Sequence, residues 1–193
     1  STPIEDWGAH PTVIELASLG DDTTRALMMG ALLLQLVQQR QAQGLTSTLR
    51  HVAVVEEAHR LLRRQTRVSD STDAGEHAAE SFAHLLAEIR AFGQSMMIVD
   101  QSPSKLIPDA IRNTQLKIVH RLTSADDQSA VAASMGLDDS QSRALASLGV
   151  GEAVAYSTRS TAPCRITVPD RLRGTDAATA IAPDDQRVAE LMM

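Results

Sequence analysis

The chain has 193 residues, of which 43% are hydrophobic and 22% charged, as in ordinary globular domains that are large enough for one core. Its formal net charge of −6 argues against a surface that coats nucleic acid, because Lys and Arg supply most of the non-specific affinity for phosphates. Aromatic residues make up only 2%, too few for a platform that stacks on single-stranded bases. A ring that contacts DNA only through pore loops is still compatible with this composition.

Cysteine content and the length of apolar runs indicate the cellular compartment of the protein. Cys164 is the single cysteine, so no intrachain disulfide can form, and we expect it to be a small buried hydrophobe in a strand over residues 163–168. The sequence contains neither a signal region nor an apolar run of membrane-spanning length. We therefore expect a cytoplasmic protein with no membrane partner.

The first predicted elements are a strand and a long helix. Residues 12–16 have the pattern of a short strand. Asp21 and Asp22 can then cap a helix that runs to about Gln43, and Gly44 ends it. Leu, Met and Ala are so frequent over residues 27–37 that we expect this helix to be well buried, with its apolar stripe in the core.

Residues 51–64, HVAVVEEAHRLLRR, contain an apolar strand that ends in two acids, Glu56 and Glu57. So apolar a strand indicates a central parallel strand that is covered on both faces. In open α/β sheets, ligands bind beyond the carboxyl ends of such strands. Adjacent side chains of a strand point to opposite faces, so the two acids could have different roles. On spacing alone, a solvated helix start with Glu near the positive end of the dipole explains the pair equally well.

Two further strands are predicted to end in polar groups at the same rim. Residues 58–64 predict a short helix, residues 65–75 a mobile loop, and residues 76–92 a helix that Gly93 ends. A strand over residues 95–100 then carries Gln101 at its end, and another strand covers residues 116–122. The alternation of strands and helices favours a parallel sheet with crossover helices.

The C-terminal part is predicted to close the domain. Ser124 can cap a helix that ends at Gly136, and a further short helix covers residues 138–148. Residues 152–157 and 164–168 have the pattern of a closing β pair. We expect residues 1–169 to form one domain and residues 170–193 a tail, which either docks on a neighbouring subunit or stays floppy.

The order of these motifs resembles a known family. The runs VVEEAHRLL, AEIRAFGQ and MMIVDQSPSKLIPDAIRNTQLKIVHRLTSADD look like the second half of the motor domain of the HerA/FtsK group of RecA-like ATPases, nearest to the HerA branch. The resemblance extends from about residue 10 to about residue 169. It implies an α/β, RecA-like P-loop NTPase fold, with a mostly parallel sheet flanked by helices and a closing antiparallel β pair.

One element of that family is missing from these 193 residues. They contain no G-x-x-x-x-G-K-[ST] run, the loop whose backbone N–H groups and Lys cradle the phosphates. We therefore interpret the chain as the C-terminal part of the motor domain, with the phosphate-binding half outside it. The resemblance implies ATP and Mg²⁺ as cofactors, and the chain by itself is expected to be inactive.

The resemblance also assigns roles to three residues. Glu56 resembles the acid that holds Mg²⁺ through water, although the family more often has Asp there. Glu57 resembles the acid that orients the attacking water as general base. Gln101 resembles the polar sensor beside the γ-phosphate, where an amide can donate to phosphate and accept from water. The alternative for Gln101 is an amide that stabilises the turn before Ser102 and Pro103.

The remaining candidates are basic. Arg90 and Arg121 could stabilise charge across a subunit boundary, because a planar guanidinium suits phosphate oxygens, although a surface ion pair explains either equally well. The resemblance makes a second group candidates for contact with nucleic acid in a pore, with pairing to acids of an adjacent subunit or a solvated helix face as alternatives. This basic cluster consists of Arg60, Arg63, Arg64 and Arg67.

Three functions follow as hypotheses. The first is the motor part of a HerA-like ATPase, assembled as a homo-oligomeric ring, a hexamer, that translocates double-stranded DNA and could work with a nuclease. Conjugation and secretion ATPases, which move protein or single-stranded DNA, are a variant of it. The second is a non-catalytic binding or oligomerisation module. The third is a metal-dependent hydrolase that uses Glu56, Glu57 and His59, although these lack the His pair of a zincin.

Overall fold

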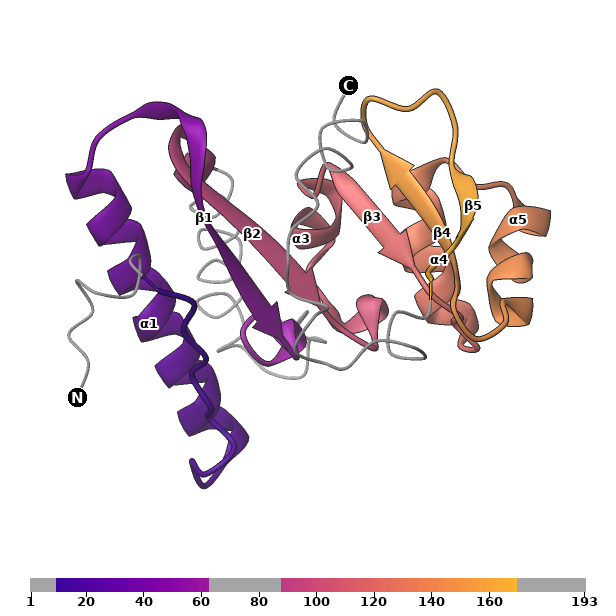
Figure 1. Cartoon of the computed structure of the whole chain (residues 1–193). Helices are drawn as coiled ribbons and strands as arrows, with labels where there is room; N and C mark the ends of the chain where they lie inside the picture. The colour runs from indigo at the N-terminus through magenta and orange to yellow at the C-terminus, as the bar shows by residue number, and fades with distance from the viewer. Residues whose placement is uncertain (1–9, 63–87, 170–193) are drawn as a thin grey trace, which may run out of the picture.

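The computed structural model describes residues 10–62 and 88–169, which form a mixed α/β fold (Figure 1). This confirms the predicted fold class. The elements in chain order are α1 (Asp22–Ala42), β1 (Thr46–Glu56), a 3₁₀ turn (Ala58–Arg60), a second 3₁₀ turn (Ile89–Ala91), β2 (Phe92–Val99), a third 3₁₀ turn (Pro103–Lys105), α3 (Pro108–Arg112), β3 (Leu116–Val119), α4 (Ala125–Met135), α5 (Asp139–Ala144), a last 3₁₀ turn (Leu145–Ser147), β4 (Glu152–Ser157) and β5 (Cys164–Thr167).

Helix α1 begins and ends where its capping residues predict. The Asp21 carboxylate accepts a hydrogen bond from the backbone N–H of Thr24 at 2.8 Å, and Gly44 follows the helix with φ +77°. Its predicted burial is wrong along much of its length, since Leu27 is 75% exposed. A helix of 21 residues packed against a single partner layer buries only one stripe of side chains. Here that stripe consists of Leu33, Leu36, Val37 and Arg40.

The strand predicted at residues 12–16 is not formed. This segment has no regular secondary structure, and Val13 is 87% exposed. An apolar run becomes a strand only when a neighbouring strand pairs with its backbone, and no described residue pairs with this one. The prediction from local pattern is therefore wrong here.

The described strands form two sheets. β1 and β2 pair in parallel, with Val52 opposite Ser95 and Glu56 opposite Val99. β3, β4 and β5 form an antiparallel sheet in that order, which confirms the predicted closing β pair. The strand predicted at residues 116–122 thus forms β3, which pairs with β4 and not with β2, while the arrows of β1, β2 and β3 point to the same side of the molecule (Figure 1).

The prediction that β1 is covered on both faces is wrong. Val52 and Val54 lie on one face and are exposed, whereas Ala53 and Val55 on the opposite face are half-buried. Helix α1 packs against β2 and the first 3₁₀ turn. No described element covers the face that carries Val52 and Val54, so the alternation of the strand leaves these side chains open.

Two boundaries around β2 differ from the predicted ones. The region after Glu57 forms one 3₁₀ turn within the described residues, and the predicted loop over 65–75 lies outside them. Most of the predicted helix over 76–92 also lies outside them. Phe92 is the first residue of β2, and Gly93, which is predicted to end the helix, lies inside this strand with φ +75°.

Two hydrophobic cores hold the fold. The first lies under the carboxyl ends of β1 and β2, with Ala58, Leu62, Leu106, Ile107 and Ala110 buried together. The second lies between the antiparallel sheet and helices α4 and α5, with Val119, Val131, Met135, Leu145 and Leu148. Each core buries apolar side chains from segments far apart in sequence, which is the dominant favourable term in folding.

Cys164 is exposed, so its predicted burial is wrong. It lies at the first position of β5, which is an edge strand of the antiparallel sheet. An edge strand has a neighbour on one side only, and its terminal residues are readily left open to solvent. A strand pattern by itself does not distinguish this position from an internal one.

Candidate active site

The carboxyl ends of β1 and β2 bring the predicted acids and amide to one rim. Because the parallel register pairs Glu56 with Val99, the next residues of each chain segment, Glu57 and Asp100, leave the sheet side by side. Gln101 follows, and its Nε2 atom donates to Oε1 of Glu57 at 3.4 Å. Parallel pairing therefore converts a separation of 44 positions in sequence into direct contact.

Glu57 has an unusual backbone. Its φ of +53° and ψ of 41° lie in the left-handed region, and among the described residues it is the only non-glycine residue with a positive φ. This conformation costs an L-residue about 1–2 kcal/mol. The following residue, Ala58, is completely buried and anchors the turn. Strain of this kind persists where the surroundings fix it, and it is frequent at active sites.

Two nitrogen atoms face the carboxylate of Glu57, one on each oxygen. Gln101 Nε2 contacts Oε1, and Nε2 of His59 lies 3.8 Å from Oε2. The Glu57 side chain is 40% exposed, so it lies open to solvent and to a ligand. A carboxylate with this exposure, set on a rigid turn, is able to accept a hydrogen bond from a water molecule.

Asp100, to which the sequence interpretation assigned no role, connects the two loops through hydrogen bonds. Its carboxylate is 3% exposed and accepts three hydrogen bonds. The donors are the backbone N–H of His59 at 2.7 Å, Nδ1 of His59 at 2.9 Å and the backbone N–H of Ser102 at 2.9 Å. The available signal was its place directly after an apolar strand and before Gln101, which matches the place of the acids on β1.

Glu56 lies on the exposed face of β1 and forms no hydrogen bond or ion pair with any described residue. Mg²⁺ bound to nucleotides commonly keeps several waters and takes only one or two carboxylates besides the phosphates. A single open carboxylate at the strand end fits that requirement. Among residues 10–62 and 88–169, no cluster of three or more His, Cys, Asp or Glu side chains could hold a metal by itself.

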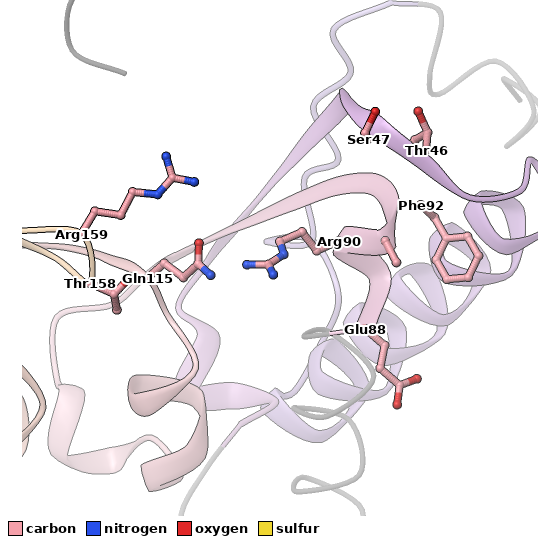
Figure 2. Close-up of a pocket in the computed structure, with 9 residues that line it drawn as sticks. Thr46, Ser47, Glu88, Arg90, Phe92, Gln115, Thr158 and Arg159 are labelled. Carbon is pink, nitrogen blue, oxygen red and sulfur yellow. The ribbon is translucent and has the colours of Figure 1, made fainter. Parts of the chain in front are cut away.

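The structure separates Arg90 from this rim. Arg90 precedes β2 whereas Gln101 follows it, so the eight residues of β2 place them about 26 Å apart. Arg90 is exposed and lines a hollow of about 750 Å³ between the two sheets. Figure 2 shows it extended toward Gln115, with Thr46, Ser47 and Arg159 also lining the hollow. Arg90 therefore cannot reach Glu57 of its own chain.

Arg121 lies two residues beyond the carboxyl end of β3. Its side chain is exposed and forms no hydrogen bond or ion pair with the described residues. Its neighbour His120 is held through Nδ1, which lies 3.0 Å from the carbonyl oxygen of Glu152.

Within the basic cluster, the structure describes only Arg60. The guanidinium of Arg60 pairs with Asp22 at the start of α1, and Asp22 also pairs with Arg25 at 3.2 Å. Arg63, Arg64 and Arg67 lie outside the described residues. The contact with Asp22 orients Arg60 toward its own chain, since a carboxylate shared by two guanidinium groups holds both nearby.

Comparison with known proteins identifies a similar family. No family model matches the chain. Over 116 residues, or 60% of the chain, it is 32% identical to the probable DNA double-strand break repair helicase HerA of Methanocaldococcus jannaschii. The chain spans 22% of the length of that relative. The matched part of the chain is therefore similar in sequence to a HerA protein.

Solved structures agree in fold. The genome packaging NTPase B204 of Sulfolobus turreted icosahedral virus 2, in complex with ATPγS, superposes with a TM-score of 0.59 over 88% of this chain and 72% of its own, at 14% identity. The pCW3 conjugation coupling protein TcpA with ATPγS gives 0.50 over 89% and 49%, at 16% identity. The predicted resemblance to the HerA/FtsK group of P-loop ATPases is thereby confirmed. Among the described residues, no helix has the length and apolar character needed to cross a membrane.

Proposed function

We propose that the chain supplies the water-activating and phosphate-sensing part of a HerA-type ATPase. The observation that carries this proposal is the contact between Glu57 and Gln101 at the shared carboxyl end of β1 and β2. A module that only binds a partner has no need for a strained acid paired with an amide at that rim. The remaining phosphate contacts would come from residues outside these 193, because the chain contains no G-x-x-x-x-G-K-[ST] run.

The resemblance to the family assigns a role to each residue of the rim, and the geometry is compatible with these roles. Glu57 orients the attacking water and accepts its proton, and Gln101 donates to the γ-phosphate. Glu56 would hold Mg²⁺ through water, and such an ion would supply neutralisation of phosphate charge. Phosphoryl transfer depends mostly on positioning and electrostatic stabilisation, so an open acid and an amide within contact distance supply what this half of the site needs.

Substitution of the base tests the proposal. In the full-length protein that carries this chain, Glu57→Gln removes the proton acceptor and keeps the shape, so kcat for ATP should fall by roughly 10²- to 10⁴-fold. Binding of a fluorescent ATP analogue should remain. Glu15→Gln, at an exposed glutamate outside the rim, is the matched control and should leave kcat unchanged. Equal turnover in Glu57→Gln and the wild type would reject the proposal.

Arg90 is proposed to act at the site of a neighbouring copy. Its distance from Glu57 in the same chain excludes action at its own site, and its exposure leaves it available to a partner. Action at a neighbouring site requires a ring of subunits. We infer a homo-oligomer, which would be a hexamer by analogy with the family. This ring would move double-stranded DNA and could work with a nuclease. Arg121 and the basic cluster remain candidates for contacts within that ring and with DNA.

Mixing two inactive variants tests this arrangement. A subunit with Arg90→Ala keeps Glu57, and a subunit with Glu57→Gln keeps Arg90. Mixed rings then contain interfaces where both groups are intact, so the mixture should hydrolyse ATP faster than the sum of the two variants. If the mixture gives only that sum, Arg90 has no role at a neighbouring site. The 193-residue chain alone should show no ATP turnover.

A further inference from the structure

A second layer of side chains lies behind Glu57. His59 follows Glu57 by two residues, and its ring faces two carboxylates. Nδ1 lies 2.9 Å from Oδ2 of Asp100, and Nε2 lies 3.8 Å from Oε2 of Glu57. The ring therefore connects a buried acid to the open acid of the rim.

Asp100 fixes the orientation of this ring. An ionised carboxylate only accepts hydrogen bonds, so the proton of this contact lies on Nδ1 of His59. The backbone N–H of His59 also donates to Asp100, at 2.7 Å, which holds both ends of the residue on one side chain. Asp100 is itself held by the backbone N–H of Ser102 and is almost fully buried. A ring with so many constraints presents Nε2 in one direction only, toward Glu57.

Glu57 needs such support because its own carboxylate is on the surface. Gln101 holds one oxygen from an exposed position, and His59 stands at the other oxygen. When Nε2 carries a proton, it donates toward Oε2 of Glu57. When it does not, a water molecule that donates to both Nε2 and Oε2 makes the same connection. In both cases the carboxylate is kept from rotating away from the water that it orients.

We propose that His59, locked by Asp100, is a positioning residue that holds the Glu57 carboxylate in its working orientation. This inference rests on the proposed function of Glu57 as the base. The loss of an outer partner that orients a catalytic ligand commonly costs 10- to 100-fold in activity. We expect a loss of this order in kcat, while KM for ATP stays near its wild-type value because His59 does not contact nucleotide.

Two amide substitutions separate positioning from structure. Asn at position 59 can still donate to Asp100 from the place of Nδ1, but it does not reach Glu57. Gln at position 59 places its amide near the position of Nε2. In the full-length protein, His59→Asn should lower kcat for ATP by roughly 10- to 100-fold without a change in thermal midpoint, and His59→Gln should restore most of that loss. His120→Ala, at an exposed histidine directly after β3, is the control and should keep the wild-type kcat.

Combination with the base variant shows through which residue His59 acts. In a Glu57→Gln background, His59→Asn should produce no further fall in kcat, since its target is already removed. Wild-type kcat in His59→Asn, with Glu57→Gln inactive, would overturn the role of His59 alone. Full activity in Glu57→Gln would instead reject the proposed function itself. Equal loss in the Asn and Gln variants would also overturn the inference, because it would indicate packing and not the position of a nitrogen atom.

Discussion

The two halves of the described structure differ in backbone strain. The half with β3, β4, β5, α4 and α5 follows local rules closely, with Ser124 capping α4 and a complete capping box at Asp138. The half with α1, β1 and β2 also has a capped helix, at Asp21, but it contains the strained backbone of Glu57. The first half supports the fold, whereas the second carries the candidate site, and local strain of this kind is frequent at functional sites.

Buried polar groups occur in both halves. In the β1–β2 half, Arg40 is buried and donates to Gln94, which also contacts Nδ1 of His51. Burial lowers the pKa of Arg40, with the nearby Arg50 adding to the effect. Among the described residues, its Nη2 atom has no hydrogen-bond partner. A buried cation of this kind is costly. In the antiparallel half, Lys117 is buried as well, and burial lowers its pKa. Its Nζ atom donates to the carbonyl oxygen of Thr114 at 2.7 Å.

The largest expected effect is on the supporting half. Leu145 is completely buried, so Leu145→Ala should lower the free energy of unfolding by about 2–5 kcal/mol through lost burial and the resulting cavity. Urea denaturation followed by far-UV circular dichroism measures this loss. Leu27→Ala, at an exposed leucine, is the matched control. A loss no larger than that of the control would show that this core does not support the fold.

Asp100 links the two loops of the site and should come next. Asp100→Ala leaves the partly buried N–H groups of His59 and Ser102 without their acceptor, which should cost roughly 1–3 kcal/mol in unfolding free energy. Asp126→Ala, at an exposed acid in the first turn of α4, is the comparison. The same urea denaturation experiment measures this loss. An effect equal to that of Asp126→Ala would show that the hydrogen bonds to Asp100 do not stabilise the two loops.

The strain at Glu57 predicts a gain in stability. Glu57→Gly should be more stable than Glu57→Ala by about 1 kcal/mol, because glycine adopts positive φ without a steric penalty. Both variants should lose ATP turnover in the full-length protein. Thermal midpoints of the two variants provide the measurement. If alanine were the more stable of the pair, the backbone at this position would not be strained.

The smallest effect is a pH dependence in the antiparallel half. The pKa of Glu152 lies below its ordinary value because its carboxylate accepts from the backbone N–H of Gly149, with the Arg165 guanidinium lowering it further. A carboxyl whose folded pKa is lowered adds stability above its unfolded pKa of about 4.3, and this contribution is lost as the pH falls through the folded value. Glu152→Gln should therefore have a lower thermal midpoint than the wild type at pH 7, and the difference should shrink in acid. A difference independent of pH would contradict the assignment.

Some features followed directly from the sequence. The caps at Asp21 and Ser124, the strand that ends in Glu56 and Glu57, and the strand before Gln101 lie where the pattern placed them. These signals act over a few residues, so they can be read without knowledge of the fold. The contact of Glu57 with Gln101 was also predictable, because parallel strands that follow each other bring their carboxyl ends to one rim.

Other features depended on contacts between distant segments. The absence of a strand at residues 12–16, the exposure of Leu27 and Cys164, and the pairing of β3 with β4 all depend on which neighbour is present. The sequence also did not indicate that His59 would lie between Asp100 and Glu57.

The sequence by itself therefore determined the order of helices and strands, the caps and the chemical character of the rim. Only the tertiary structure decided which faces are buried, that Arg90 lies at the far end of β2 from Glu57, and that Asp100 locks His59. The physical reason is that propensity and capping are local, whereas burial, strand pairing and side-chain contacts across a sheet are set by residues far apart in the chain.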